Sequence, residues 1–158
     1  MKTSLSVRRA EKQDLPAVCE VERISFKDPY PPFFIEMLLK LNPSTFFVAE
    51  NEKQIVGYLI TTKDRCTGHI VSLAVLPQQR RNGIGSALMK TGLETFRRLE
   101  VETVRLEVRE SNREAQQFYE AHGFEYNHKM VGYYGDEDAL VYYRKISSSD
   151  CANAAYCS

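Results

Sequence analysis

The sequence predicts an α/β domain, in which strands and helices alternate along the chain. Three observations favour this class: apolar and polar residues alternate with period two in several segments, other segments carry apolar residues at i, i+3, i+4 and i+7, and turn residues separate the two kinds. Strands are expected at 4–8, 45–50, 54–62, 69–75, 102–109, 126–131 and 139–146, and helices at 14–24, 34–41, 84–98 and 111–122.

The first helices are separated by a proline-rich link. Asp14 is expected to cap the first helix, with Pro16 in its first turn. The prolines in 28–32 remove backbone donors and favour extended geometry in the residues before them, so this segment is predicted not to be helical. The second helix follows, with an apolar stripe that begins at Phe34.

The second half of the chain carries a clear strand and a clear helix start. In 102–109 the side chains of 104, 106 and 108 are apolar and those of 105, 107 and 109 are charged, which is strand periodicity. Ser111 and Glu114 have the spacing of a capping box, and Gly123 is expected to end that helix. Residues 147–158 are small and polar, and we expect them to form a disordered tail after a single domain at 1–146.

Composition excludes several classes of protein. The chain has 158 residues, 21 basic and 21 acidic, so it lacks the basic excess of a nucleic-acid binder. It has no apolar run near the roughly 20 residues of a membrane helix. The four cysteines are scattered without metal-site spacing, and the N-terminus reaches charge before a signal-peptide core forms, so we expect a cytoplasmic protein without a metal.

The segment after the strand at 69–75 carries the strongest chemical signal. Arg80, Arg81, Asn82, Gly83, Ile84, Gly85 and Ser86 lead into a helix. Glycines allow close approach of a ligand, and the first amides of a helix attract an anion such as phosphate; a helix simply entered through glycines is the alternative. The spacing fits neither a P-loop nor a dinucleotide fingerprint, because Lys90 lies in mid-helix and Leu88 occupies the third small position.

The ordered motifs L-A-V (73–75), R-x-x-G-x-G (80–85) and L-E-V-R-E-S-N-x-x-A-x-x-F-Y-x-x-x-G-F (106–124) resemble the GNAT superfamily of acetyltransferases. With 68–75 and 133–139, the pattern is similar to its protein N-terminal acetyltransferases, both the NatA-type catalytic subunits and the bacterial ribosomal-protein enzymes. The resemblance covers residues 3–146. It implies a mixed, mostly antiparallel sheet with helices on both faces, splayed between the fourth and fifth strands, with acetyl-CoA in the gap.

The resemblance also implies roles for individual residues. Leu73, Ala74 and Val75 would hold the pantetheine through the strand backbone, and the amides of residues 81–86 would cradle the pyrophosphate, with the side chains of Arg80 and Arg81 as further phosphate contacts. Asn112 matches a cofactor-contacting position, although helix capping explains it equally. Glu107 matches the base, and Tyr119 matches the tyrosine that protonates the CoA sulfur and contacts the cofactor.

Each of these assignments has a structural alternative. Glu107 is also suited to pairing with its arginine neighbours, and Tyr119 to a place in the core. His69 is a weaker catalytic candidate than Glu107 and is better suited to a structural role. The charged side of 102–109 would suit a wet cleft in this family, or simply a solvated face.

Substrate selection would come from two aromatic loops. In the family they flank the acceptor peptide, and here they carry Phe26 and Tyr30, and Tyr133 and Tyr134; ordinary hairpin aromatics are the alternative for the second pair. The first loop reads Asp-Pro-Tyr-Pro where many bacterial relatives have Pro-Trp, so their preferred first residue is not carried over.

The expected activity is direct acetyl transfer from acetyl-CoA to the α-amino group of proteins or peptides, with nascent chains or ribosomal proteins as partners and an auxiliary subunit possible. Neutralising an α-amine at pH 7 requires about 1 kcal/mol, against about 4.6 kcal/mol for lysine, so a modest base suffices. The alternatives are acetylation of a small amine or lysine side chain, and a non-catalytic acetyl-CoA-binding module.

The zero net charge is unevenly distributed. Residues 80–113 carry 8 basic and 5 acidic side chains, whereas 114–143 carry 1 basic and 6 acidic. The basic excess falls on the expected cofactor segment, and the acidic excess on a segment that includes a loop expected to receive a cationic N-terminus.

Overall fold

The structure, a computed structural model, describes residues 4–146. Its elements in chain order are β1 (Leu5–Arg9), a 3-10 turn (Lys12–Asp14), α1 (Leu15–Ser25), α2 (Pro32–Leu41), β2 (Phe46–Asn51), β3 (Gln54–Asp64), β4 (Thr67–Val75), a 3-10 turn (Pro77–Gln79), α3 (Ile84–Arg98), β5 (Thr103–Arg109), α4 (Arg113–Ala121), β6 (Glu125–Met130) and β7 (Ala139–Lys145). The expected tail at 147–158, with Cys151 and Cys157, lies outside the described residues.

Three local predictions about helix starts are wrong. Pro32 is the first residue of α2 rather than part of the non-helical link, because a proline is tolerated where a helix amide has no partner. Asp14 stands at the N-cap position of α1, but its carboxylate binds Arg8 and the backbone of Glu11 instead of capping the helix. The cap of α4 is Asn112, whose side chain accepts from the amide of Ala115, and not Ser111.

The strands form a mixed sheet in the order β1-β2-β3-β4-β5-β7-β6. β4 and β5 form its parallel pair, with Thr67, Gly68 and His69 opposite Thr103, Val104 and Arg105. The predicted mixed, mostly antiparallel sheet is therefore confirmed. The described residues divide into two compact units, one of 4–62 and 71–95 and the other of 63–70 and 96–146.

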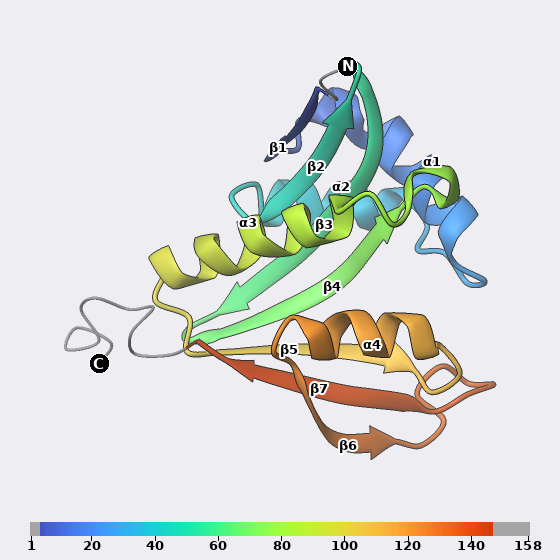
Figure 1. The fold of residues 1–158 in the computed structure, drawn as a ribbon, viewed down its shortest axis with the longest axis vertical. Coiled ribbons are helices and arrows are strands. Elements are labelled where there is room, and N and C mark those ends of the chain that lie inside the picture. Colours follow the sequence, from blue (N-terminus) through green and yellow to red (C-terminus); the bar gives the residue numbers. More distant parts are fainter. Residues whose placement is uncertain (1–3, 147–158) are drawn as a thin grey trace. The chain divides into compact units, whose positions relative to one another are not determined.

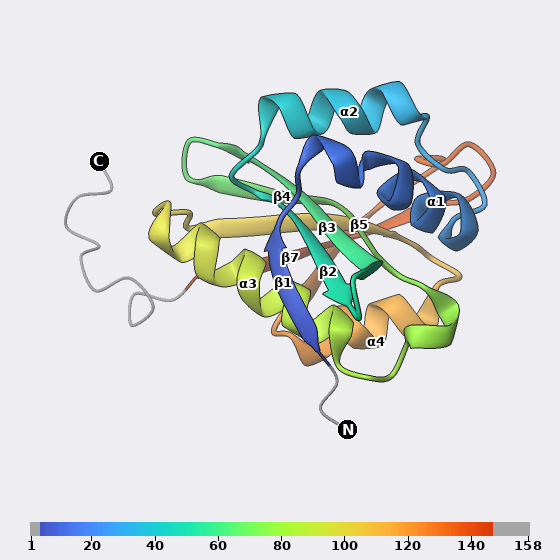
Figure 2. The same cartoon turned by 90° about the horizontal axis from the view of Figure 1, so that it is seen from above.

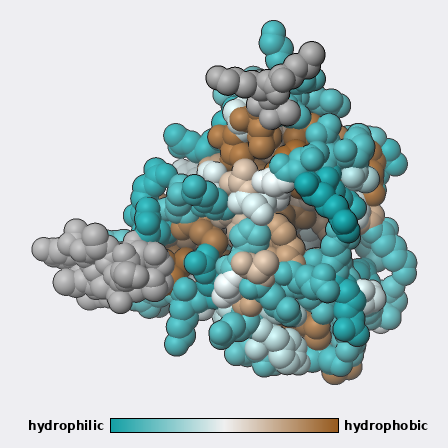
Figure 3. Space-filling view, viewed as in Figure 1, coloured by the Kyte–Doolittle hydropathy of each residue, from teal (hydrophilic) through white to brown (hydrophobic). Residues whose placement is uncertain are grey.

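In the first unit, β1, β2 and β3 pair antiparallel, and helices cover both faces of these strands. Helices α1 and α2 lie side by side on one face and α3 lies on the other (Figure 2). A Cβ on Gly57 would lie 2.9 Å from the carbonyl oxygen of Ala74, so β3 and β4 approach closely at this glycine. In the view of Figure 3, hydrophobic surface is visible over β1 and β2.

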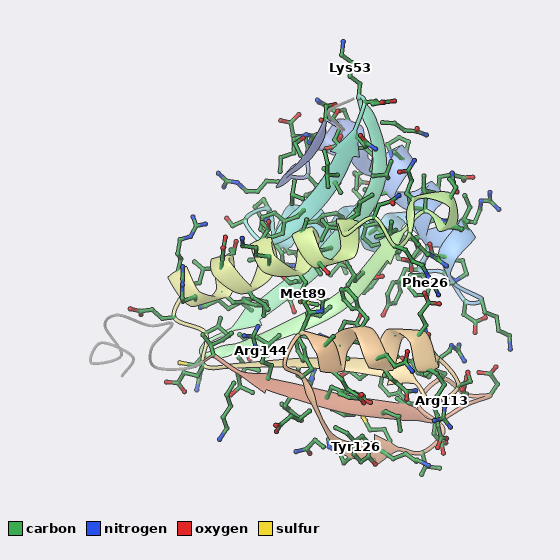
Figure 4. All side chains as sticks on the ribbon, in the orientation of Figure 1. Phe26, Lys53, Met89, Arg113, Tyr126 and Arg144 are labelled. Atoms are coloured by element: carbon green, nitrogen blue, oxygen red, sulfur yellow. The ribbon has the colours of Figure 1, made fainter. Side chains whose placement is uncertain are left out.

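In the second unit, β5 pairs with β7, and β7 with β6. Val104, Leu106 and Val108 are buried, as their alternation predicts. Helix α4 covers β5 and β7 (Figure 1), and the hydroxyl of Tyr142 on β7 donates to Glu120 on α4 at 3.0 Å. The end of α4 is a glycine turn, because Gly123 has a φ of +85° and a Cβ there would meet the side chain of Arg144. Arg144 lies at this end of α4 and Arg113 at the other (Figure 4).

No helix among residues 4–146 combines the length and the apolar character needed to cross a membrane.

Candidate active site

The polar side of β5 carries an ion-pair cluster. Because His69 stands opposite Arg105 in the parallel pair, its imidazole falls on the side of the sheet that carries Arg105 and Glu107. Its Nε2 lies 2.6 Å from Oε2 of Glu107. The Nε of Arg105 lies 3.2 Å from the other carboxylate oxygen, as an ion pair without hydrogen-bond geometry, and it makes no other hydrogen bond among the described residues. Glu107 thus pairs with an arginine neighbour, as its structural alternative predicted, and it also has His69 as a partner.

Two opposed effects act on the pKa of Glu107. Burial, the largest single effect, raises the pKa, but the hydrogen bond and charge of His69 and the charge of Arg105 together outweigh it. The pKa of Glu107 is therefore lowered, and its carboxylate is ionised at neutral pH. The side chain of Glu107 is only 10% exposed, whereas that of His69 is 26% exposed, so the imidazole is the more accessible member of the pair.

The loop between β6 and β7 is fastened to the end of β5. Glu137 accepts from the amide of Ser111 at 2.6 Å and from Nη1 of Arg109 at 3.2 Å. The same guanidinium binds Asp136 at 3.0 Å and lies 4.3 Å from the ring centre of Tyr134. The rings of Tyr133 and Tyr134 contact each other edge to face. The aromatic pair that sequence analysis selected is therefore held by charged residues of β5 and of the loop itself.

The charged residues on β5 also affect the pKa of Tyr133. Burial raises the pKa of its hydroxyl, the negative charge of Glu107 raises it further, and Arg105 lowers it. The ring nevertheless stays 47% exposed. Tyr133 is thus close enough to Glu107 to interact with its charge, and it is also exposed to solvent.

Tyr119 is buried on α4. Its ring packs edge to face against Phe118 and Phe124, as its alternative as a core residue predicts. Burial raises the pKa of its hydroxyl well above the usual range, so the group stays protonated and can donate a proton or hydrogen bond.

The expected cofactor segment has the backbone of an anion site. Arg81 and Gly83 both have positive φ, at +66° and +77°, and a Cβ on Gly83 would meet nothing within 4 Å. The turn opens into α3, whose first amides have no partner within the helix. Arg81 and Asn82 are exposed, and Arg80 is exposed with its Nε bound to the carbonyl of Val75 at 2.9 Å. This donor set and open surface fit a pyrophosphate.

Two expected contact residues have other partners in the structure. Asn112 caps α4, which is the alternative that the sequence left open. Phe26 at the end of α1 (Figure 4) and Tyr30 are 37% and 40% exposed, and Tyr30 packs its ring against Phe34 at 4.9 Å.

No group of three or more His, Cys, Asp or Glu residues within 4–146 is arranged to hold a metal ion.

Sequence reasoning gave little weight to two features. The sequence indicates His69 only as a weaker catalytic candidate than Glu107, and it is the place of His69 opposite Arg105 in the sheet that brings it to Glu107. Glu22 was not selected at all, although a glutamate one turn after Val18 and next to Val21, on the apolar face of a predicted helix, was a visible signal.

A comparison with protein families identifies the class to which this chain belongs. Residues 15–124 match the model of the acetyltransferase (GNAT) family. The chain belongs to this family. The range includes the expected cofactor segment, Glu107 and Tyr119, and it ends before the loop of Tyr133 and Tyr134.

Individual relatives extend over most of the chain. An uncharacterized N-acetyltransferase of Methanocaldococcus jannaschii is 41% identical, with 88% of this chain and 90% of that protein covered. An N-alpha-acetyltransferase of Sulfurisphaera tokodaii is 35% identical, with 85% and 89% covered. Among solved structures, Ard1 of Thermoplasma volcanium is 31% identical with a TM-score of 0.89, covering 91% of this chain and 99% of that one. The ribosomal-protein-S18-alanine N-acetyltransferase of Escherichia coli is 26% identical with a TM-score of 0.82, covering 90% and 94%.

Proposed function

We propose that this protein transfers the acetyl group of acetyl-CoA to the α-amino group at the N-terminus of proteins. The observation that carries the proposal is the hydrogen bond between His69 and Glu107, a proton-accepting pair beside an accessible tyrosine loop. Relatives named N-alpha-acetyltransferase, at 35% and 30% identity over most of the chain, support the acceptor class.

In the proposed reaction, the neutral amine attacks the thioester carbonyl carbon, a C–N bond forms, and the C–S bond breaks. The proton of the amine passes to the His69 and Glu107 pair, directly or through water, and Tyr119 gives its proton to the leaving thiolate. A carboxylate of lowered pKa is a weak base, but it suffices for an α-amine whose own pKa is about 8.

Acetyl-CoA is the proposed cosubstrate, held by 73–75 and 80–86. A solved relative at 26% identity, Naa20 of Chaetomium thermophilum, has a bisubstrate analogue bound, which supports this assignment. The turn at Arg81 and Gly83 would receive the pyrophosphate on backbone amides, since no side chain occupies the space above Gly83.

The proposed partners are N-termini of nascent chains and ribosomal proteins, with an auxiliary subunit as a further candidate, and the proposed location is the cytoplasm. The likeness to an enzyme that acts on ribosomal protein S18 supports the ribosomal proteins. The scattered cysteines support the location.

The test uses purified full-length protein, acetyl-CoA, and peptides that vary in their first two residues and contain an internal lysine. Mass spectrometry then locates the acetyl group. We expect it on the α-amine, with a rate that rises with pH through about 8 as that amine loses its proton. Acetylation of internal lysines or free polyamines alone would overturn the proposal, and thiol release that stays at background would favour a non-catalytic module.

A further inference from the structure

Glu22 is a buried carboxylate that the proposed reaction does not use. It lies on α1 and is 2% exposed. It has no ion-pair partner within the described part of the chain. A buried carboxyl group without a cation requires strong hydrogen-bond partners, and an apolar residue would serve simple helix packing better. The hydrogen-bond donors around Glu22 therefore indicate why a glutamate occupies this buried position.

These donors come from three different segments of the first unit. The Oε2 atom accepts from the hydroxyl of Tyr58 on β3 and from the hydroxyl of Ser72 on β4, the latter at 3.1 Å. The Oε1 atom accepts from the backbone amide of Tyr30 at 3.0 Å. One oxygen of the carboxylate is thus bound to the sheet, and the other is bound to the link between α1 and α2.

The amide of Tyr30 is important for attaching this segment, because the prolines around it have no backbone N–H group. Residues 29, 31 and 32 are prolines, so Tyr30 has the one backbone N–H group in 29–32. That group is bound by Glu22. Glu22 therefore holds the one backbone amide of 29–32 through its side chain, while its backbone carbonyl accepts from the amide of Phe26 at the start of the link.

We propose that Glu22 is a positioning residue for the acceptor peptide, because it fixes the loop that presents Phe26 and Tyr30. The inference rests on the proposed function, in which this loop flanks the peptide. Ser72 precedes Leu73, whose backbone is proposed to hold acetyl-CoA. The carboxylate of Glu22 therefore joins the acceptor loop to the cofactor strand within one unit.

Steady-state kinetics test the proposal with three variants of the full chain. Glu22→Ala should raise the peptide KM about tenfold, the effect of losing a hydrogen bond to a charged group, while the KM of acetyl-CoA and the kcat at saturating peptide stay within about twofold. Glu22→Gln keeps the shape and one oxygen acceptor, so its peptide KM should rise by only about threefold. Glu20→Gln is the matched control on the same helix, where Glu20 is exposed and pairs with Arg23, and it should behave as wild type.

Amide hydrogen exchange gives a second readout that does not depend on catalysis. The Tyr30 amide should be protected in wild type and should exchange faster in both Glu22 variants, while the core amide of Leu59 keeps its protection. Unchanged Tyr30 exchange in folded Glu22→Gln, or an equal rise in the KM of acetyl-CoA and of peptide, would overturn the proposal. If Glu22→Ala fails to fold, Glu22→Gln decides the matter. If wild type acetylates no N-terminus, the proposed function fails, and Tyr30 exchange still decides whether Glu22 holds this amide.

Discussion

Two neighbours of Glu107 lower the pKa of its carboxyl group. His69 and Arg105 both favour the ionised carboxylate, and together they overcome burial. The carboxylate of Glu107 is therefore ionised at neutral pH and is available to accept a proton in the proposed reaction. This is consistent with a base that accepts a proton from an amine already close to neutrality.

Glu107→Gln should lower kcat by about 10- to 100-fold, because an amide cannot accept the proton or hold the imidazole as a carboxylate does. The dissociation constant of acetyl-CoA, measured by calorimetry, should stay within about twofold of wild type. Glu125→Gln, an exposed glutamate on β6, is the control and should keep wild-type turnover. Wild-type turnover in Glu107→Gln would remove Glu107 from the mechanism.

Tyr119→Phe should also lower kcat, by about tenfold or more, because the leaving thiolate loses its proton donor. The substitution keeps the ring that packs against Phe118 and Phe124, so the midpoint of thermal unfolding should change little. The measurement is thiol release under saturating substrates, beside a melting curve. A lower melting temperature with unchanged kcat would assign Tyr119 to the core alone.

At the scale of elements, the loop between β6 and β7 is organised by contacts from β5. Arg109 and Glu137 connect the end of β5, the start of the segment before α4, and the tyrosine pair. The hydrogen bonds from Ser111 are the main reason that the pKa of Glu137 is lowered. The loop thus has a defined conformation before any peptide binds.

Glu137→Gln should loosen this loop and raise the peptide KM by about three- to tenfold, because charge-assisted hydrogen bonds to Arg109 and the Ser111 amide become weaker. The KM of acetyl-CoA should not change. Asp136→Asn should have a smaller effect, since Arg109 retains Glu137 as a partner. A larger effect on acetyl-CoA than on peptide would show that the loop serves the cofactor instead.

The elements themselves were largely predictable, because their burial follows the period of the apolar residues, as in β5 and α3. Helix starts were less predictable, since Asp14 and Ser111 are both suited to capping but bind groups outside the helix. The carboxylate of Asp14 accepts from Arg8, and the backbone amide of Ser111 donates to Glu137. Those partners are distant along the chain or lie in another element, and local propensity does not contain them. The pairing of His69 with Glu107 was unpredictable for the same reason, because it depends on how β4 and β5 are aligned in the sheet and not on the sequence around either residue.

At the scale of the whole molecule, several carboxylates link folding to pH. Hydrogen bonds from Arg8 are the largest effect on Asp14 and lower its pKa against the opposing effect of burial. The pKa values of Glu107 and Glu137 are also lowered. A carboxyl with a lowered folded-state pKa stabilises the fold above its unfolded pKa and loses this contribution as the pH falls through the folded value. The protein should therefore lose stability in acid.

Asp14→Asn should lower the free energy of unfolding by about 1–3 kcal/mol at neutral pH, because a buried, doubly bonded partner of Arg8 is lost. The difference from wild type should shrink as the pH falls below about 4, because Asp14 of the unfolded chain gains a proton there while the folded carboxylate, whose pKa is lowered, is still ionised. Urea unfolding at a series of pH values measures it, with the exposed Asp64→Asn as control. A difference that stays constant down to about pH 3 would show that the charge of Asp14 does not contribute.

Gly68 has a consequence for how this chain can vary over evolution. A Cβ at this position would lie 2.7–2.9 Å from three ring carbons of Phe96, at the point where β4 pairs with Val104 of β5. Every other amino acid would displace a buried aromatic ring from the parallel pair. Natural variation at 68 should therefore be confined to glycine wherever Phe96 is retained, and a drift toward larger residues should occur only in lineages where position 96 has first become smaller.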